Sequence, residues 1–253
     1  MVSPFLRSSA SASSGPGPSQ SGESAAQAIV DMLPRLHVLV IGPGLGRDAV
    51  TLGQVASVIK AARSKDPPVP MVLDADCLFL IQAQPDLVRG YRECILTPNV
   101  VEFARLAKAV HVDVQPGDRD ACERLATAMG GVCIIQKGPV DNISNGEGTA
   151  VCDLPGGRKR SGGQGDTLTG SLGTFLAWRQ AYHDGLWDAG DKQQKMSRTE
   201  TLLVAAFAGS AITRECSRRA FEKKGRSMQA GDLTDEVHGS FLALVGEPEG
   251  SKL

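Results

Sequence analysis

The sequence is poor in aromatic residues, has no excess of charge of either sign and contains no long apolar run. Phenylalanine, tyrosine and tryptophan make up 4% of its 253 residues, which argues against stacking on single-stranded bases. Lysine and arginine number 27 against 28 aspartates and glutamates, so no overall field attracts nucleic acid or an anionic membrane. No apolar run reaches the roughly 18 residues of a membrane span. A polyanionic small molecule remains a compatible ligand, because helix ends can hold phosphate without net charge.

Paired cysteines are also missing. The six cysteines, none of which belongs to a Cys-x-x-Cys pair, are Cys77, Cys94, Cys122, Cys133, Cys152 and Cys216. This spacing argues against a zinc site, and we assign no metal ligands among them. We expect reduced, partly buried thiols in an intracellular protein.

Residues 1–30 contain little that could build a core. They are rich in serine, glycine, proline and alanine, with no acidic residue before Glu23 and Arg7 as the only basic one. We therefore expect a disordered low-complexity segment over residues 1–30, followed by one domain over residues 31–253. A transit peptide shares this composition but carries more arginine, so the expected compartment is cytoplasmic or mitochondrial.

Strand-like and helix-like stretches alternate along the rest of the chain. Leu36–Ile41 is a continuous apolar run, which predicts a strand buried on both faces of a parallel sheet. Further strands are predicted in "PPVPMVLDADCLFLI", "RECIL" and "VCIIQKG", with a hairpin in "DNISNGEGTAVCDL" that turns at Asn145-Gly146. Helices are predicted in "AVTLGQVASVIKAARSK", from about Val100, in "DRDACERLATAMGG" and near Leu202–Ile212, where we assign no chemistry. This order predicts an α/β fold of three layers with a mostly parallel central sheet.

Polar and glycine-rich segments follow the predicted strands, and such folds bind ligands beyond the carboxyl ends of their strands. The segments are Gly42–Asp48, Asp74–Asp76, Thr97–Glu102, Lys137–Asp141 and Gly162–Asp166. The first is close to a dinucleotide fingerprint, but its third glycine comes one residue too early for G-x-G-x-x-G. Their gathering on one rim is a stronger indication of a ligand site than any single segment.

The stretch "SGGQGDTLTGSLGTFLAW", residues 161–178, places three glycines and an aspartate ahead of a long apolar helix. Gly162, Gly163 and Gly165 lack a Cβ, so the backbone can approach a ligand and present N–H groups at a helix N-terminus. Asp166 fits either an N-cap or a general base beside a phosphate cradle. The glycines in front of it favour the base, in phosphoryl transfer to a hydroxyl group.

"GGQGDTLTGSLG" resembles the GxGD anion-hole motif of ribokinase-like kinases. With "VIGPGLGRD", "VLDADCLFLI", "ILTPNVVEFARL" and "IIQKGPVDNISNG" in order, residues 31–247 are similar to the eukaryotic ATP-dependent (S)-NAD(P)H-hydrate dehydratases. The resemblance implies a ribokinase-like three-layer α/β/α domain. It also implies a lyase that uses ATP and Mg²⁺ to remove water from hydrated NADH or NADPH, releasing ADP and phosphate. The implied functional partner is the epimerase of the hydrate, and a homo-oligomer is compatible with the sequence.

The resemblance also implies site residues. Asp166 would activate the hydroxyl of the hydrated ring, and the backbone of Gly163 to Gly165 would form the anion hole. Residues implied to bind ATP are Lys137, Gly138, Pro139, Val140, Asp141, Gly156, Gly157, Arg158, Lys159, Arg160, Ser161, Gly162, Gly163, Gln164 and Gly165. Residues implied to bind the hydrated cofactor are Gly44, Asn99, Val100, Val101, Glu102, Phe103, Ala104, Arg105 and Asp166.

Several of these residues also fit purely structural roles. Asn99 is a suitable helix N-cap, and Glu102 suits the positive end of the same helix. Lys137 at a strand end is also typical of a solvated ammonium group on an apolar stem. Asp74 and Asp76 fit hydrogen-bonded loop residues and metal ligands equally well.

The sequence departs from the family at two places. Val100 and Val101 stand where relatives often carry a histidine or Pro-Gly, which changes side-chain contacts but not the backbone turn. Before Leu36, low-complexity residues stand where the family has a glycine-rich opening and a Tyr-x-Gly-Ala-Pro type motif. We therefore expect an N-terminally truncated domain whose ATP chemistry is intact, whose substrate wall is incomplete and whose exposed apolar surface lowers its stability.

Three functions stay open on the sequence alone. The first is the hydrate dehydratase. The second is a kinase of the same fold for a vitamin precursor or sugar, whose product keeps the phosphate. The third is a catalytically weak, truncated form with a binding or regulatory role.

Overall fold

A six-stranded mixed sheet lies at the centre of the molecule. The computed structural model describes residues 5–12, 22–115, 117–186 and 195–247. The strands are β1 (Leu39–Ile41), β2 (Met71–Leu73), β3 (Cys94–Leu96), β4 (Cys133–Gln136), β5 (Asp141–Ser144) and β6 (Thr149–Cys152). They lie in this order, parallel from β1 to β4 and antiparallel from β4 to β6. The expected mostly parallel sheet and its terminal hairpin are confirmed.

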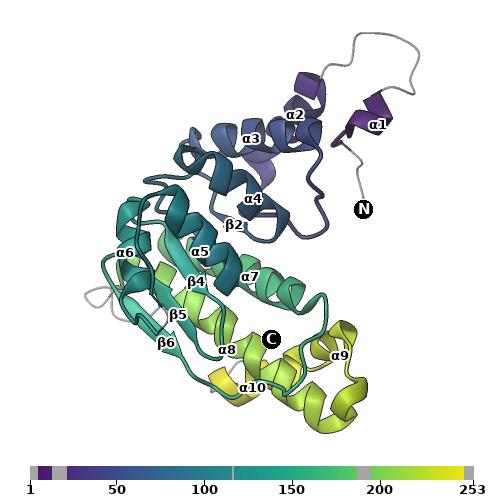
Figure 1. Cartoon of the computed structure of the whole chain (residues 1–253), viewed down its shortest axis with the longest axis vertical. Coiled ribbons are helices and arrows are strands. Elements are labelled where there is room, and N and C mark those ends of the chain that lie inside the picture. Colours follow the sequence, from purple (N-terminus) through teal and green to yellow (C-terminus); the bar gives the residue numbers. More distant parts are fainter. Residues whose placement is uncertain (1–4, 13–21, 116, 187–194, 248–253) are drawn as a thin grey trace.

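Helices connect the strands and cover both faces of the sheet. They are α1 (Ser9–Ala12), α2 (Gly22–Val30), α3 (Ala49–Arg63), α4 (Asp76–Ala83), α5 (Val100–Ala109), α6 (Ala121–Ala128), α7 (Gln164–Asp184), α8 (Arg198–Lys224), α9 (Ala230–Asp235) and α10 (Val237–Val245). The predicted helices correspond to α3, α5, α6, α7 and α8, whereas α1, α2, α4, α9 and α10 were not predicted. Figure 1 shows α1 to α3 at one end of the molecule and α9 and α10, coloured yellow-green, at the other.

Alternate residues of each strand point to opposite faces of the sheet. Met71 and Leu73 of β2 join the core cluster formed with α3, α4, α5 and α6. Val72, between them, joins the cluster formed with α7 and α8. The result is the expected three-layer α/β/α arrangement, in which α7 and α8 cover one face alone (Figure 1).

Side-chain caps explain where two of the helices begin. The backbone N–H groups of Val50 and Thr51 donate to Asp48 Oδ1 at 3.0 and 3.1 Å, at the start of α3. Ser197 and Glu200 form a reciprocal capping box at the start of α8. Each cap satisfies backbone donors that the helix itself leaves unpaired.

The first predicted strand differs from the observed one. We expected Leu36–Ile41 to be buried on both faces, but β1 is shorter and Val40 is 44% exposed. The physical reason is its position, because in the described part of the chain β1 is an edge strand that pairs only with β2. Val40 lies against α7 at Gly173, where an added Cβ would stand 2.9 Å from Cγ2 of Val40.

Part of the segment 1–30, for which we predicted disorder, lies within the described structure, as residues 5–12 and 22–30. Helix α2 packs against α3, and Ala26 is 4% exposed. The backbone N–H of Arg7 donates to Gln54 Oε1 at 2.9 Å, and Ser9 bonds to Asp48. An apolar stripe in "SAAQAIV" outweighs the polar composition of the segment as a whole. The rest of this prediction, residues 1–4 and 13–21, lies outside the described residues.

All six cysteines are free and buried, as expected for reduced thiols. Burial, with the nearby charge of Asp74, raises the pKa of Cys77 to about 12. A thiol with so high a pKa is a poor nucleophile. No helix within residues 5–12, 22–115, 117–186 and 195–247 is both long and apolar enough to cross a membrane.

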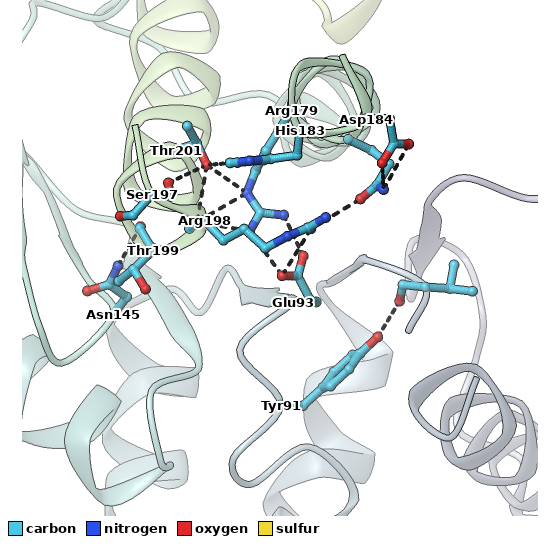
Figure 2. A network of polar contacts seen from close by, with 12 residues as sticks. Tyr91, Glu93, Asn145, Arg179, His183, Asp184, Ser197, Arg198, Thr199 and Thr201 are labelled. Carbon is cyan, nitrogen blue, oxygen red and sulfur yellow. Dashed lines mark hydrogen bonds and ion pairs between the residues drawn. The ribbon is translucent and has the colours of Figure 1, made fainter. Parts of the chain in front are cut away.

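A polar network ties α7 and α8 to the amino end of β3, far from the strand ends that carry the predicted site. Arg179 of α7 forms a bidentate ion pair with Glu93, which directly precedes β3 (Figure 2). Arg198 of α8 lies 3.7 Å from the same carboxylate. Arg179 Nε also donates to Thr201 Oγ1, which lies 2.7 Å from His183 Nε2. The guanidinium of Arg179 is buried, so this pair fixes both long helices on the sheet.

Candidate active site

The carboxyl ends of β1 to β4 meet on one rim of the sheet. The backbone N–H groups of Asp74 and Thr97 donate to the last residues of β1 and β2, at 3.1 and 3.2 Å. Asn99 and Lys137 extend the pairing of β3 and β4 by one isolated parallel bridge. The structure therefore brings together segments that the sequence places after separate strands.

Helix α7 begins at the glycine-rich stretch and presses on this rim. Its N-cap is Gly163, whose φ of +91° lies in the left-handed region that favours glycine. An added Cβ on Gly165 would stand 3.1 Å from Asp74 Oδ2. The positive end of a 21-residue helix therefore lies against the end of β2, where it favours an anion.

Asp166 lies in the first turn of α7 without capping it. Its backbone N–H donates to the carbonyl of Gly163 at 3.0 Å, and Gly163 is the cap. Asp166 is exposed, and its side chain makes no hydrogen bond or ion pair to any described residue. The N-cap interpretation of Asp166 is therefore wrong, and its carboxylate is available to a ligand.

A cavity of about 640 Å³, here called the loop cavity, lies beside the start of α7. It is lined by the β3–α5 turn, the loop after β4, the glycine-rich loop and α8. The predicted residues among its lining are Asn99, Val100, Val101, Lys137, Gly138, Asp141, Gly156, Gly157, Arg160, Ser161, Gln164 and Gly165. Most residues implied to bind ATP therefore surround one cavity, together with part of the implied substrate set.

The glycine-rich loop is fixed by contacts with the C-terminal helices. The backbone N–H of Gly157 donates to Ser217 Oγ of α8 at 3.2 Å. Lys159 Nζ donates to the carbonyl of Met228 at 2.6 Å, so this ammonium group is used within the protein. Arg158 is exposed and does not line the loop cavity. Of the three consecutive cations, only Arg160 faces it.

The start of α5 serves mainly to build the turn after β3. Asn99 Oδ1 accepts from the backbone N–H groups of Val101 and Glu102 at 3.0 Å, and Glu102 Oε2 accepts from the N–H of Asn99 at 2.9 Å. This capping box leaves Val100 and Val101 56% and 57% exposed. Phe103 is 1% exposed, and its side chain packs within the core beneath this turn. A run of consecutive helical residues cannot face a single ligand, because every third or fourth turns to the core.

The other residues expected at the substrate, Gly44, Ala104 and Arg105, are exposed and do not line the loop cavity. The loop after β1 that carries Gly44 is held by Asp76, whose Oδ1 lies 2.9 Å from Arg47 Nε. Asp76 therefore acts as a loop residue. Within the described ranges, no three histidine, cysteine, aspartate or glutamate side chains form a group that could hold a metal ion.

Sequence reasoning missed the contribution of α8. Thr213, Arg214 and Ser217 line the loop cavity from α8, directly after the stretch Leu202–Ile212 to which we assigned no chemistry. Arg214 pairs with both oxygens of Asp141, at 2.9 and 2.7 Å. The available signal was the recurrence of polar residues at helical spacing from Ser210 onward, next to an apolar run.

A second cavity of about 920 Å³, here called the helix cavity, runs along α7 toward α9 and α10. Gly163 and Asp166 line one end of it, and Trp178 and Phe241 line the other. Gly165 lines the loop cavity instead, so the first turn of α7 separates the two. A carboxylate beside an anion-favouring helix end, between two cavities, can accept a proton from a hydroxyl group while a phosphoryl group is transferred.

Comparison with known proteins shows which family the chain resembles. The family model Carb_kinase, described as NAD(P)H-hydrate dehydratase, matches residues 9–238. The ATP-dependent (S)-NAD(P)H-hydrate dehydratase of Ajellomyces capsulatus is 56% identical, and the alignment covers 100% of this chain and 80% of that protein.

Solved structures share the fold. A ribokinase-like superfamily protein of Enterococcus faecalis superposes with a TM-score of 0.63 at 19% identity, covering 88% of this chain and 69% of that one. The ADP/ATP-dependent NAD(P)H-hydrate dehydratase of Bacillus subtilis, co-crystallised with ATP/Mg²⁺, gives a TM-score of 0.55 at 20% identity. It covers 87% of this chain, and this chain covers 76% of it. The ribokinase-like fold is thereby confirmed.

Proposed function

The chain belongs to the NAD(P)H-hydrate dehydratase family, and from this membership we propose that it removes water from hydrated NADH or NADPH at the expense of ATP. The observation that carries the proposal is its 56% identity, over its whole length, to an enzyme of that name. The reaction is a hydro-lyase step that returns a damaged cofactor to its usable form. The geometry supports it, because Asp166 stands free at the start of α7.

We assign the loop cavity to ATP. Nine residues of segments 137–141 and 156–165 line it, and the first turn of α7 gives its end a positive potential. Lys137 and Arg160 add cationic groups beside the expected phosphates. Arg158 and Lys159 enter the proposal only as parts of the loop, since neither side chain lines the cavity.

Asp166 acts as the general base. It accepts the proton of the ring hydroxyl while the hydroxyl oxygen bonds to the γ-phosphorus of ATP and ADP leaves. The backbone of Gly163 and Gly165 stabilises the charge on the phosphoryl oxygens. Hydration added a hydrogen and a hydroxyl group across a ring double bond. The reverse step therefore releases the hydroxyl oxygen as phosphate while the neighbouring carbon loses a proton.

We place the hydrated ring next to Asp166, which lines the helix cavity. The exposed Val100 and Val101 line the loop cavity, across the first turn of α7 from Asp166, and we keep them as part of the proposed substrate surface. Gly44, Ala104 and Arg105 are exposed and remain part of the proposed substrate surface. Asn99 and Glu102 contribute by shaping the turn through their capping box. Phe103 contributes only to the core beneath it.

Mg²⁺ is proposed to accompany ATP. The residues around the loop cavity fit a metal held mostly by phosphate, since no group of three acidic, histidine or cysteine side chains lies within the described residues. Such sites usually rely on substrate phosphates, water and one or two carboxylates. When bound, the ion supplies positive charge that offsets the charge building up on the phosphate oxygens.

A functional partner follows from stereochemistry. An enzyme named for the (S) hydrate leaves the other epimer untouched, so we propose that an epimerase supplies the epimer that this chain uses. Such a partnership requires a shared substrate pool, and it does not require contact between the two proteins.

Product analysis tests the proposed function. We expect purified protein, given ATP, Mg²⁺ and hydrated NADH, to restore the absorbance of NADH and to release about one phosphate for each NADH formed. A stable phosphorylated product without NADH would instead identify a small-molecule kinase of the same fold. The absence of both products would favour a catalytically weak form.

A further inference from the structure

A buried ion pair lies under the start of α7. Lys137 Nζ donates to Asp74 Oδ1 at 2.9 Å, across 63 residues of sequence. The side chain of Asp74 is 5% exposed and that of Lys137 is 26% exposed. The second oxygen of Asp74 faces Gly165, whose added Cβ would stand 3.1 Å from it. The pair therefore joins the ends of β2 and β4 to the glycine-rich loop of residues 162–165, here called the anion loop.

Thr97 lies between the two partners with an unused polar group. The pairing of Leu73 with Leu96 places Thr97 level with Asp74, directly after the neighbouring strand β3. Thr97 is fully buried, and its Oγ1 has no hydrogen-bond partner among the described residues. A buried hydroxyl without a partner is costly unless a ligand or an ordered water completes it. The core next to Asp74 therefore contains a polar group that the described part of the fold does not use.

We propose that Asp74 is a positioning residue, which holds the ammonium group of Lys137 beneath the anion loop for phosphoryl transfer. The inference rests on the proposed function. Lysine has a long flexible stem and a compact charge, so its ammonium group needs a fixed partner to stand at one point. A buried carboxylate at hydrogen-bond distance supplies that partner. Asp74 itself does not line the loop cavity, whereas Lys137 does.

The carboxylate of Asp74 has two opposite effects on the reaction. It orients Lys137 toward the phosphoryl group, whose charge grows during transfer, and this favours the transition state. It also places a negative charge near the ATP phosphates, which weakens ground-state binding. Removing the charge should therefore lower kcat without raising the KM for ATP. A change that merely damaged the fold would not separate these constants in that direction.

The experiment is a double-mutant cycle in the full chain with ATP, Mg²⁺ and hydrated NADH. We expect Asp74→Asn to lower kcat by roughly 10- to 100-fold, with the KM for ATP unchanged or lower. Lys137→Met should lower kcat by about 10²–10³-fold. The variant carrying both changes should be no slower than Lys137→Met alone, because Asp74 acts through Lys137.

A matched control removes a buried carboxylate partner at the opposite end of the sheet. Glu93→Gln breaks the ion pair with Arg179 (Figure 2). It should lower the thermal midpoint and leave kcat within about twofold, as a purely structural pair does. If Asp74→Asn does not fold, Asp74→Glu keeps the charge and moves the ammonium group. Asp74→Glu alone should then lower kcat. Added to Lys137→Met, it should cause no further loss of kcat.

Multiplicative losses in the cycle would overturn the inference, because they would mean that Asp74 and Lys137 act independently. Recovery of Asp74→Asn at high Mg²⁺ would also overturn it, in favour of a role at the metal. If Asp74→Asn had the same kcat as the unchanged protein, the inference would also be overturned. A wild-type chain that forms no NADH would instead contradict the proposed function, so the two failures are distinguishable.

Discussion

Arg214 of α8 and Asp141 at the start of β5 form a bidentate ion pair across 73 residues of sequence. The guanidinium Nε and Nη2 lie 2.9 and 2.7 Å from the two carboxylate oxygens. The remaining donors reach the backbone carbonyls of Gly138, Pro139 and Leu154, at 2.9 to 3.2 Å. One side chain thus fastens the loop after β4 and the end of the hairpin to α8. The shape of the loop cavity depends on it.

Arg214→Lys should weaken ATP binding. A single ammonium group cannot replace a planar fork that serves two carboxylate oxygens and several carbonyls. We expect the Kd for ATP to rise about tenfold or more, and the free energy of unfolding to fall by about 1–3 kcal/mol, the range for buried acceptors that lose their donors. Calorimetric titration with ATP and denaturant unfolding measure the two effects.

The control is Arg198→Lys on the same helix, because the side chain of Arg198 is 47% exposed. Equal ATP affinity in all three proteins would exclude residues 137–141 from the nucleotide site.

Local patterns explain how much of the molecule could be predicted. The strand order follows from short apolar runs separated by helical stretches, and Asn99 with Glu102 three residues later is a capping box visible in the sequence. The helix α4 was missed because a five-residue apolar run such as "CLFLI" fits a strand as well as a buried helix. The residue directly before α4, Ala75, has a positive φ, which the conformational preference of alanine does not predict.

Long-range partners account for most of the rest. Nothing near Arg214 in the sequence indicates Asp141, and nothing near Lys137 indicates Asp74, because such pairs form only when the chain folds. The exposure of Val40 has the same origin, since an apolar run does not reveal whether its strand lies at an edge. The site residues on contiguous loops were easier to predict, because backbone around a phosphate needs glycine locally.

Gly157→Ala should disturb the loop cavity by steric overlap. An added Cβ would stand 2.4 Å from the carbonyl oxygen of Ser217 and 2.8 Å from its Oγ. The loop must then move away from α8, which we expect to raise the KM for ATP and to cost about 1–3 kcal/mol of stability, as overpacking does.

Gly53→Ala provides the contrasting substitution. Gly53 lies within α3, with no atom within 4 Å of an added Cβ, so alanine should stabilise the protein by about 0.5–1 kcal/mol. Thermal midpoints and ATP kinetics of both variants check the comparison. An unchanged KM in Gly157→Ala would show that the loop can move without affecting the nucleotide.

Glu215→Gln should change how stability depends on acid. Hydrogen bonds from Arg218, the largest cause, and from Arg219 lower the pKa of Glu215 from 4.5 to about 2, although burial opposes them. A carboxylate whose pKa is lower in the folded state stabilises that state above pH 4.5 and loses this effect as the pH falls toward 2. We therefore expect Glu215→Gln to have a lower thermal midpoint at neutral pH.

The difference between the Glu215→Gln variant and the unchanged protein should shrink between pH 4.5 and 2 and vanish below it. Midpoints measured from pH 7 downward test this, with Glu222→Gln as the control because Glu222 is 60% exposed. Two parallel curves across the whole range would rule out the stabilising role of the Glu215 carboxylate.

Asp166→Asn should abolish most turnover while ATP still binds. The carboxylate is the only proposed proton acceptor at the start of α7, and loss of a general base commonly lowers the rate by about 10²–10⁴-fold. Stability should change little, because Asp166 is exposed and its side chain has no partner among the described residues. The favourable interaction of a carboxylate with the helix dipole limits that loss to about 0.3–1 kcal/mol.

Asp184→Asn, at the other end of the same helix, should leave both the rate and ATP binding unchanged. Single-turnover formation of NADH, alongside ATP titration, separates chemistry from binding. Turnover close to normal in Asp166→Asn would mean that a different group, or solvent, accepts the proton of the ring hydroxyl.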